Sequence, residues 1–139
     1  MTERHLRARP VLPGAARGQA LKVATLSLWG GIDSQTGRLI DPQSGHAGDP
    51  VAGRILVIGE PRGSSSSSAV MLELLHAGLA PAAVLLGRID AILGLGIVVA
   101  RELGWPTIPL LELDHATIEA IPDGSRIEVR AGGDLHIID

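Results

Sequence analysis

The sequence predicts an α/β fold, with central parallel strands joined by crossover helices and an additional β layer beside them. Two observations predict this class. Residues 54–111 alternate between short apolar runs and helical patterns, and such an order implies right-handed crossovers between parallel strands. Residues 1–53, in contrast, are rich in Gly, Pro and Asp and lack helical periodicity, which indicates further, antiparallel β structure.

The size and composition are those of one globular domain. The chain has 139 residues, of which 45% are hydrophobic and 19% charged, and a disordered chain would be poorer in apolar residues. The two tryptophans, Trp29 and Trp105, are the only aromatic residues of the Phe, Tyr and Trp class, so the core must consist of Leu, Ile, Val and Ala. We expect a single domain over residues 1–139, with residues 1–10 forming a flexible N-terminus.

Several classes of partner and chemistry are excluded. The net charge is −3 without a basic stripe or stacking aromatics, so nucleic acid is not expected as a partner. A membrane span needs about 18 consecutive apolar residues, which are absent, and no apolar segment follows the arginines near the N-terminus, so we expect a cytoplasmic protein. The sequence contains no cysteine, which rules out disulfides and Cys-ligated metal clusters made by this chain alone.

The N-terminal part predicts strands separated by loops. Residues 20–29 are rich in β-forming residues and Leu and predict a strand, with which residues 11–18 could pair. Residues 30–37 have the composition of a loop, because glycines permit positive φ and Asp33 can bond to its own backbone. Residues 38–40 predict a short strand.

The part of the chain from residue 54 onward gives clearer signals of secondary structure. Residues 54–58 form a continuous apolar run, as expected of a strand buried on both faces. A helix is expected over residues 64–76, since serine is a good N-cap and Gly78 and Pro81 are stop signals. The further expected elements are strands at 82–86 and 107–111, helices at 91–103 (capped by Asp90) and 114–120, and a hairpin of strands 125–130 and 135–138.

The segment GEPRGSSSSS, residues 59–68, is the most informative part of the chain for function. It lies between a buried strand and a helix, where ligands bind in parallel sheets. The N–H groups of the helix N-terminus and the charge of Arg62 favour an anionic ligand, either a carboxylate or a phosphate. The alternative is a purely structural role, in which the serine run only caps the helix.

Two familiar site types do not fit this segment. A Walker-type phosphate loop requires a lysine, which is absent, and a hydrolase nucleophile elbow requires G-x-S-x-G, whereas the window at Gly63 reads GSSSS. An anion-binding serine loop remains, and its hydroxyl could be reactive. A neutral serine is a poor base, but a helix N-terminus and a guanidinium both stabilise its alkoxide, and both features adjoin Ser64.

Several motifs, in their order along the chain, resemble those of the small subunit of aconitase X. They are LWGGID at 28–33, Thr36-Gly37, GRIL at 53–56, RGSSS at 62–66 and APAA at 80–83. The resemblance implies a swivelling β/β/α domain and a hydro-lyase whose large subunit carries an iron–sulfur cluster, with no cofactor bound by this chain. It also implies cis-3-hydroxy-L-proline or mevalonate 5-phosphate as the substrate.

The resemblance also assigns roles within the serine loop. In the aconitase superfamily a Gly-Ser-Ser-Arg loop supplies its first serine as the base. Aligned on Gly63, Ser64 takes the position of the catalytic base and Ser65 follows it. Ser66 stands where the family has arginine, so Arg62, or an arginine of the partner, would hold the substrate carboxylate. The implied substrate-binding residues are Arg62, Gly63, Ser65 and Ser66.

Other polar or exposed positions give weaker signals. The residues kept as possible interface or site positions are Trp29, Gly30, Gly31, Asp33 and His46. A pair of helical glycines, Gly94 and Gly96, suggests close packing of this helix against the sheet. Besides the dehydratase subunit, two alternatives remain open: a stand-alone anion-binding module, and a structural partner subunit without a catalytic residue.

Overall fold

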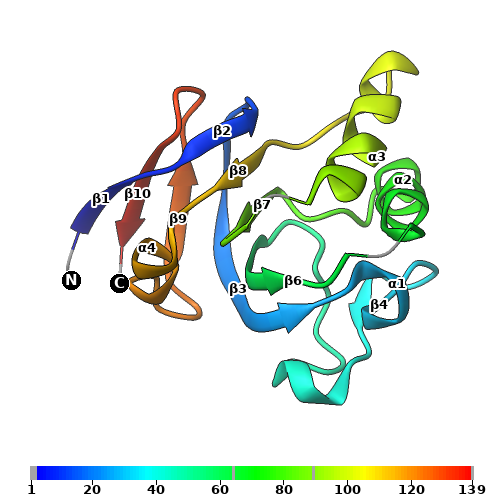
Figure 1. The fold of residues 1–139 in the computed structure, drawn as a ribbon, viewed down its shortest axis with the longest axis horizontal. Coiled ribbons are helices and arrows are strands. Elements are labelled where there is room, and N and C mark those ends of the chain that lie inside the picture. Colours follow the sequence, from blue (N-terminus) through cyan, green and yellow to red (C-terminus); the bar gives the residue numbers. More distant parts are fainter. Residues whose placement is uncertain (1–2, 64, 89, 139) are drawn as a thin grey trace.

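The computed structural model describes residues 3–63, 65–88 and 90–138, which form a mixed sheet with helices on its flanks (Figure 1). The strands are β1 (Glu3–Arg7), β2 (Arg9–Leu12), β3 (Ala16–Leu26), β4 (Ile32–Asp33), β5 (Arg38–Leu39), β6 (Ile55–Pro61), β7 (Ala83–Leu86), β8 (Leu110–Glu112), β9 (Arg126–Val129) and β10 (Asp134–Ile138). The helices are α1 (Leu28–Gly31), the 3-10 helix η1 (Pro42–Ser44), α2 (Ser67–Ala77), α3 (Ala91–Glu102) and α4 (His115–Glu119). The strand order of the main sheet is β1-β10-β9-β3-β6-β7-β8-β2.

The parallel part of the sheet confirms the predicted α/β class. Strand β6 pairs in parallel with β3 and β7, and β7 pairs in parallel with β8. Helix α2 connects β6 to β7 and helix α3 connects β7 to β8, and the two helices lie beside each other on one side of the sheet (Figure 1). The crossover arrangement read from residues 54–111 is therefore confirmed.

Strand β6 is buried on both faces, as its apolar run predicts. Leu56 and Ile58 belong to the hydrophobic cluster that includes residues of α2 and α3. Ile55 and Val57 belong to a second cluster with residues of α4, β9 and β10. Because successive side chains of a strand point to opposite faces, one short run supplies the centre of both clusters.

Strand β3 joins the parallel part of the sheet to the additional β layer. Its first four residues, Ala16–Gln19, pair antiparallel with β9, whereas the rest of the strand pairs in parallel with β6. The predicted C-terminal hairpin is confirmed, since β9 and β10 pair antiparallel across the turn at Gly133. The long strand β3 therefore belongs both to the parallel part of the sheet and to the additional β layer.

The N-terminal segment differs from two expectations. From Glu3 onward, residues 1–10 are not a flexible terminus, because β1 pairs with β10 and β2 pairs with β8. Residues 11–18 do not pair with the following strand, since Ala16 already begins β3. Both errors concern pairings with strands more than 90 positions away, which alternation within the segment does not reveal.

The helices begin near the predicted positions. The carboxylate of Asp90 caps α3 by accepting hydrogen bonds from the backbone N–H groups of Ile92 and Leu93, and Asp114 caps α4 in the same way. Helix α2 begins at Ser67, three residues later than expected, with Ser66 at the N-cap position. No helix within the described ranges has the length and apolar character needed to cross a membrane.

The two helical glycines allow close packing on two different neighbours. A Cβ built on Gly94 would lie 3.3 Å from Cδ2 of Leu110 in β8, so this glycine faces the sheet. A Cβ on Gly96 would lie 2.6 Å from the backbone oxygen of Ser68, so this glycine faces α2. The expected close packing against the sheet is confirmed at Gly94, whereas it is wrong for Gly96, whose neighbour is helix α2, which follows the serine loop.

Candidate functional site

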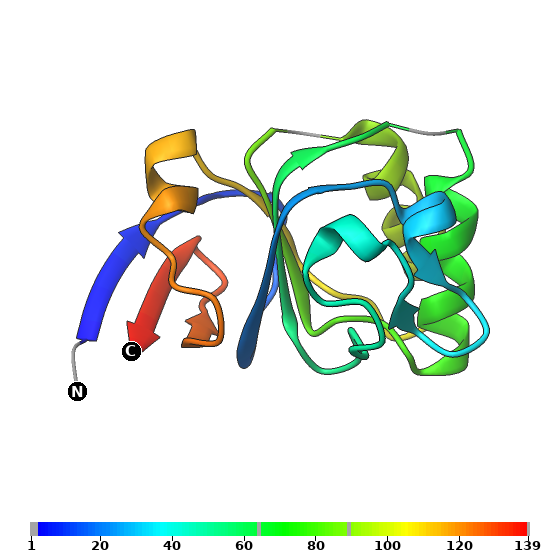
Figure 2. The same cartoon turned by 90° about the horizontal axis from the view of Figure 1, so that it is seen from below.

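The candidate site lies at the edge of the sheet where the parallel strands end. Strands β3 and β6 and the segment after β7 reach this edge together, at the top of Figure 2. The loop after β6 leads there into the N-terminus of α2. The expected ligand position at the carboxyl ends of parallel strands is thus occupied by the serine loop.

Residues 59–62, the stem of the serine loop, are fixed to the sheet, whereas Gly63 and Ser65 beyond them are exposed. The backbone N–H of Arg62 donates a hydrogen bond of 2.9 Å to the carbonyl oxygen of Leu26 at the end of β3. The side chain of Arg62 is exposed and forms no ion pair with any described residue. Gly63 and Ser65 are also exposed, whereas Ser64, the predicted base, lies outside the described residues. The loop therefore presents a cation next to accessible backbone.

Helix α2 adds to the positive potential at this loop. Its first residue is Ser67, and Ser66 at the N-cap is half-buried. The carbonyl oxygen of Ser66 accepts a hydrogen bond of 3.1 Å from the backbone N–H of Val70, which begins the helical pattern. The free N–H groups of the first turn carry about half a positive charge, so together with Arg62 they favour an anion here.

A second arginine reaches the same edge and was missed by the sequence reasoning. Arg88 follows β7 by two residues, and its Nη2 lies 2.7 Å from Oε1 of Glu60 in β6. The same nitrogen donates a hydrogen bond of 3.3 Å to the carbonyl oxygen of Pro61. A signal was present, since Arg88 follows the apolar run of a parallel strand after one glycine, at the carboxyl end of the strand, where site residues often stand.

Helix α1, after β3, places Trp29 on the surface. This side chain is 63% exposed, so it does not belong to the core, and the interface interpretation remains open. Gly30 has a φ of 81° in the left-handed region, and Gly31 is buried against the side chain of Leu26. Asp33 acts as a turn former, because its carboxylate accepts a hydrogen bond of 2.9 Å from the backbone N–H of Gln35.

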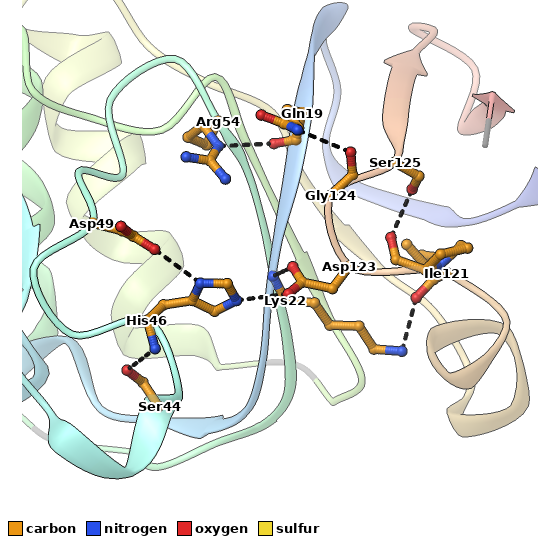
Figure 3. Close-up of polar contacts among 11 residues, drawn as sticks. Gln19, Lys22, Ser44, His46, Asp49, Arg54, Ile121, Asp123, Gly124 and Ser125 are labelled. Carbon is orange, nitrogen blue, oxygen red and sulfur yellow. Dashed lines mark hydrogen bonds and ion pairs between the residues drawn. The ribbon is translucent and has the colours of Figure 1, made fainter.

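His46 lies in a polar cluster with Asp49 and Asp123 (Figure 3). Its Nδ1 is 2.9 Å from Oδ2 of Asp49, and its Nε2 is 2.7 Å from Oδ2 of Asp123. Burial alone lowers the pKa of His46, but the hydrogen bonds and charges of the two carboxylates outweigh it and raise this pKa above its ordinary value. Within the described part of the chain His46 contacts Ser44, Asp49 and Asp123, so a structural role is favoured.

The described part of the chain offers no resident metal centre. It contains no group of three or more His, Asp or Glu side chains that could hold a metal ion, and the sequence has no cysteine. The ligands of an iron–sulfur cluster, which are usually cysteine thiolates, do not exist in this chain.

The comparisons with known proteins agree on one family for this chain. The profile described as the aconitase X swivel domain matches residues 5–137. A cis-3-hydroxy-L-proline dehydratase of Pseudomonas aeruginosa is 43% identical over 103 residues, covering 73% of this chain and 18% of that protein. A phosphomevalonate dehydratase small subunit of Aeropyrum pernix is 35% identical over 133 residues, covering 95% of this chain and 92% of that subunit.

The chain spans only a small part of some of these relatives. It covers 18% of the Pseudomonas aeruginosa dehydratase and 20% of a cis-3-hydroxy-L-proline dehydratase of Hypocrea jecorina. These proteins therefore contain a region similar to this chain and a much larger remainder.

Solved structures agree with the fold. The crystal structure of Thermococcus kodakaraensis aconitase X in its holo-form matches with a TM-score of 0.84 and 27% identity, over 98% of this chain and 99% of that chain. The solution NMR structure of a UPF0107 protein matches with a TM-score of 0.84 and 33% identity, over 98% of this chain and 100% of that chain. The expected architecture, with parallel strands, crossover helices and an additional β layer, is thus confirmed.

Proposed function

The chain belongs to the aconitase X swivel domain family, and we propose from this premise that it is the small subunit of a hydro-lyase. In this proposal it supplies its serine loop to a large subunit and is active only in that complex. The similarity to a phosphomevalonate dehydratase small subunit, over 95% of this chain and 92% of that subunit, supports the small-subunit role. The expected cytoplasmic location remains part of this proposal.

The proposed substrate is a hydroxylated small molecule with an anionic group. The names of the relatives give two candidates, cis-3-hydroxy-L-proline and mevalonate 5-phosphate, and both molecules carry a carboxylate. The single observation that carries the proposal is the geometry of the loop after β6. There, Arg62 is fixed by its backbone to β3 beside the positive N-terminus of α2. This geometry suits the anionic group of either candidate.

The proposed chemistry is the elimination of water with Ser64 as the base. The Ser64 alkoxide removes a proton from carbon and becomes a neutral hydroxyl, and the electrons of that C–H bond form a C=C bond. The hydroxyl group on the adjacent carbon takes up a proton from solvent and leaves as water. Arg62 and the N–H groups at the start of α2 stabilise the alkoxide and orient the substrate anion. The iron–sulfur cluster implied for the large subunit would act as a Lewis acid on the departing hydroxyl group.

The test combines the purified chain with the aconitase X large subunit of the same organism and assays both substrates. We expect dehydration of one substrate by the complex and none by either subunit alone. Elimination of water by the isolated chain would contradict the two-subunit proposal.

The same experiment separates the two alternatives. Tight binding of inorganic phosphate or a carboxylate by the isolated chain, without activity in the complex, would favour an anion-binding module. Full activity of the complex after Ser64→Ala would favour a structural partner subunit.

A further inference from the structure

Two glycines bring β6 and β7 unusually close together just before the candidate site. A Cβ built on Gly87 would lie 2.1 Å from the carbonyl oxygen of Gly59, a separation that no side chain tolerates. The backbone N–H of Gly87 also donates a hydrogen bond of 2.9 Å to the carbonyl oxygen of Ile58. The two strands are therefore still joined one residue beyond the end of β7.

The next residue on each strand forms an ion pair. In the parallel register Ile58 lies opposite Leu86, so the same register carried two residues further places Glu60 opposite Arg88. Their contact of 2.7 Å agrees with this placement. Nη2 of Arg88 also donates to the carbonyl oxygen of Pro61, the last residue of β6. Arg88 thus contacts two consecutive residues of the stem that leads into the serine loop.

The opposite side of this stem is held by β3. A Cβ on Gly59 would lie 3.0 Å from the carbonyl oxygen of Ala24, and the N–H of Arg62 is bonded to Leu26. Among the described residues, the stem is therefore fixed by backbone contacts with β3 on one side, and on the other side by the backbone of Gly87 and, beyond it, by the side chain of Arg88. Beyond the stem, a Cβ on Gly63 would meet no other described atom within 4 Å, so the loop is open at this residue.

We propose that Arg88 is a positioning residue, which together with Glu60 braces the stem that carries Arg62 into the serine loop. The inference rests on the proposed function for its effect on catalysis, but its structural part does not. Arg88 is 64% exposed and Glu60 54% exposed in the free chain. Exposed ion pairs contribute little to global stability, so the effect should be local.

The test uses Arg88→Ala, Glu60→Ala and the double variant. A matched control is the ion pair of Arg130 and Glu128, with side chains 52% and 49% exposed and a 3.0 Å contact in the β9–β10 region. Arg130→Ala and Glu128→Ala remove a pair of similar exposure that does not touch the stem.

The first measurement is hydrogen exchange of the Arg62 amide in the full chain, followed by NMR. This amide reports on the stem because it is hydrogen-bonded to Leu26. We expect it to exchange roughly fivefold faster in each brace variant, the scale of one exposed ion pair, and at the wild-type rate in both controls. Unchanged exchange in the brace variants would overturn the inference whatever the activity of the complex.

The second measurement is steady-state kinetics of the complex. Displacing a catalytic group lowers the rate of the chemical step, so kcat should fall about tenfold in either single variant, with KM changed less than about twofold. The double variant should resemble Arg88→Ala, because that change already removes both the ion pair with Glu60 and the hydrogen bond to Pro61. A large rise of KM in Arg88→Ala but not in Glu60→Ala would instead indicate that Arg88 contacts the substrate. This result would contradict the proposed positioning role.

The two measurements keep the two proposals apart. Faster exchange of the Arg62 amide without any dehydratase activity of the wild-type complex would refute the proposed function and leave the brace standing. Loss of activity in Ser64→Ala, combined with wild-type exchange and kcat in the brace variants, would refute only the brace.

Discussion

His46 and Asp123 lie 77 positions apart in the sequence, yet Nε2 of the imidazole is 2.7 Å from Oδ2 of the carboxylate. The other ring nitrogen faces Asp49, and the second oxygen of Asp123 accepts a hydrogen bond of 2.9 Å from the backbone N–H of Lys22 in β3 (Figure 3). The cluster therefore joins the loop after η1 to the turn before β9 and to the strand that carries both layers. Two carboxylates favour the doubly protonated imidazole.

This cluster predicts a pH-dependent stability. Because the pKa of His46 is raised in the folded chain, its protonation favours folding. The contribution is fully present below the pKa of the unfolded chain, about 6.5, and is lost as the pH rises through the higher folded value. We expect His46→Gln to lower the melting temperature clearly at pH 5.5 and much less at pH 9, as measured by circular dichroism.

His115 provides the control for this prediction. Its side chain is 81% exposed on α4 and its contact with Glu119 is 3.6 Å, so His115→Gln should leave the melting temperature nearly unchanged at both pH values. A difference between wild type and His46→Gln that stays constant from pH 5.5 to 9 would contradict the assignment of a charged His46.

Ser64→Ala in the assembled complex should lower kcat at least about a hundredfold. General-base catalysis usually contributes about 10²- to 10⁴-fold, and KM should change much less because the lost interaction forms mainly in the transition state. Folding should be almost unaffected, since Ser66 occupies the N-cap position of α2. Steady-state kinetics with thermal melts of the same preparations measure both effects.

Two further serine variants test the register of this loop. Ser68→Ala should leave kcat nearly unchanged, because Ser68 already lies inside α2. Near-normal kcat in Ser64→Ala together with an inactive Ser65→Ala would show that the base is one position further along. If neither variant reduced kcat, the base would belong to the other subunit.

Trp29→Ala should weaken the association of the two subunits without destabilising this chain. A side chain that is 63% exposed contributes little to the core, so the free energy of unfolding should change by less than about 0.5 kcal/mol. Large aromatic side chains often dominate interfaces, and we expect the Kd of the complex to rise at least about tenfold, as measured by calorimetry. An unchanged Kd would show that Trp29 does not contribute to the subunit interface.

Gly96→Ala should destabilise the chain, whereas Gly94→Ala, two positions away in the same helix, should not. The new Cβ at 96 would lie 2.6 Å from backbone oxygen of Ser68, and overpacking of this kind costs about 1–3 kcal/mol. At 94 the Cβ would meet only the end of the Leu110 side chain at 3.3 Å, and alanine gains up to about 1 kcal/mol of helix propensity. Urea unfolding of both variants measures the contrast, and equal stabilities would contradict it.

Local sequence signals determined the parallel half of this protein. The apolar run at 54–58 predicts a doubly buried strand because both faces of β6 meet side chains, and the carboxylate of Asp90 predicts the start of α3 because it satisfies free N–H groups there. The serine loop was also predicted in place, since a helix following a parallel strand leaves its N-terminus at the carboxyl edge of the sheet. These features depend on residues close together in the chain.

Only the tertiary structure decided the pairings between distant segments. Strand β1 has a half-exposed alternation that fits an exposed segment equally well, and its pairing with β10 depends on backbone hydrogen bonds that carry no side-chain signature. The same holds for Arg88 beside Glu60 and for His46 beside Asp123, because a charged residue in a sequence does not indicate its partner. The register of the sheet and the path of the loops fix these contacts, and both arise from the packing of the whole chain.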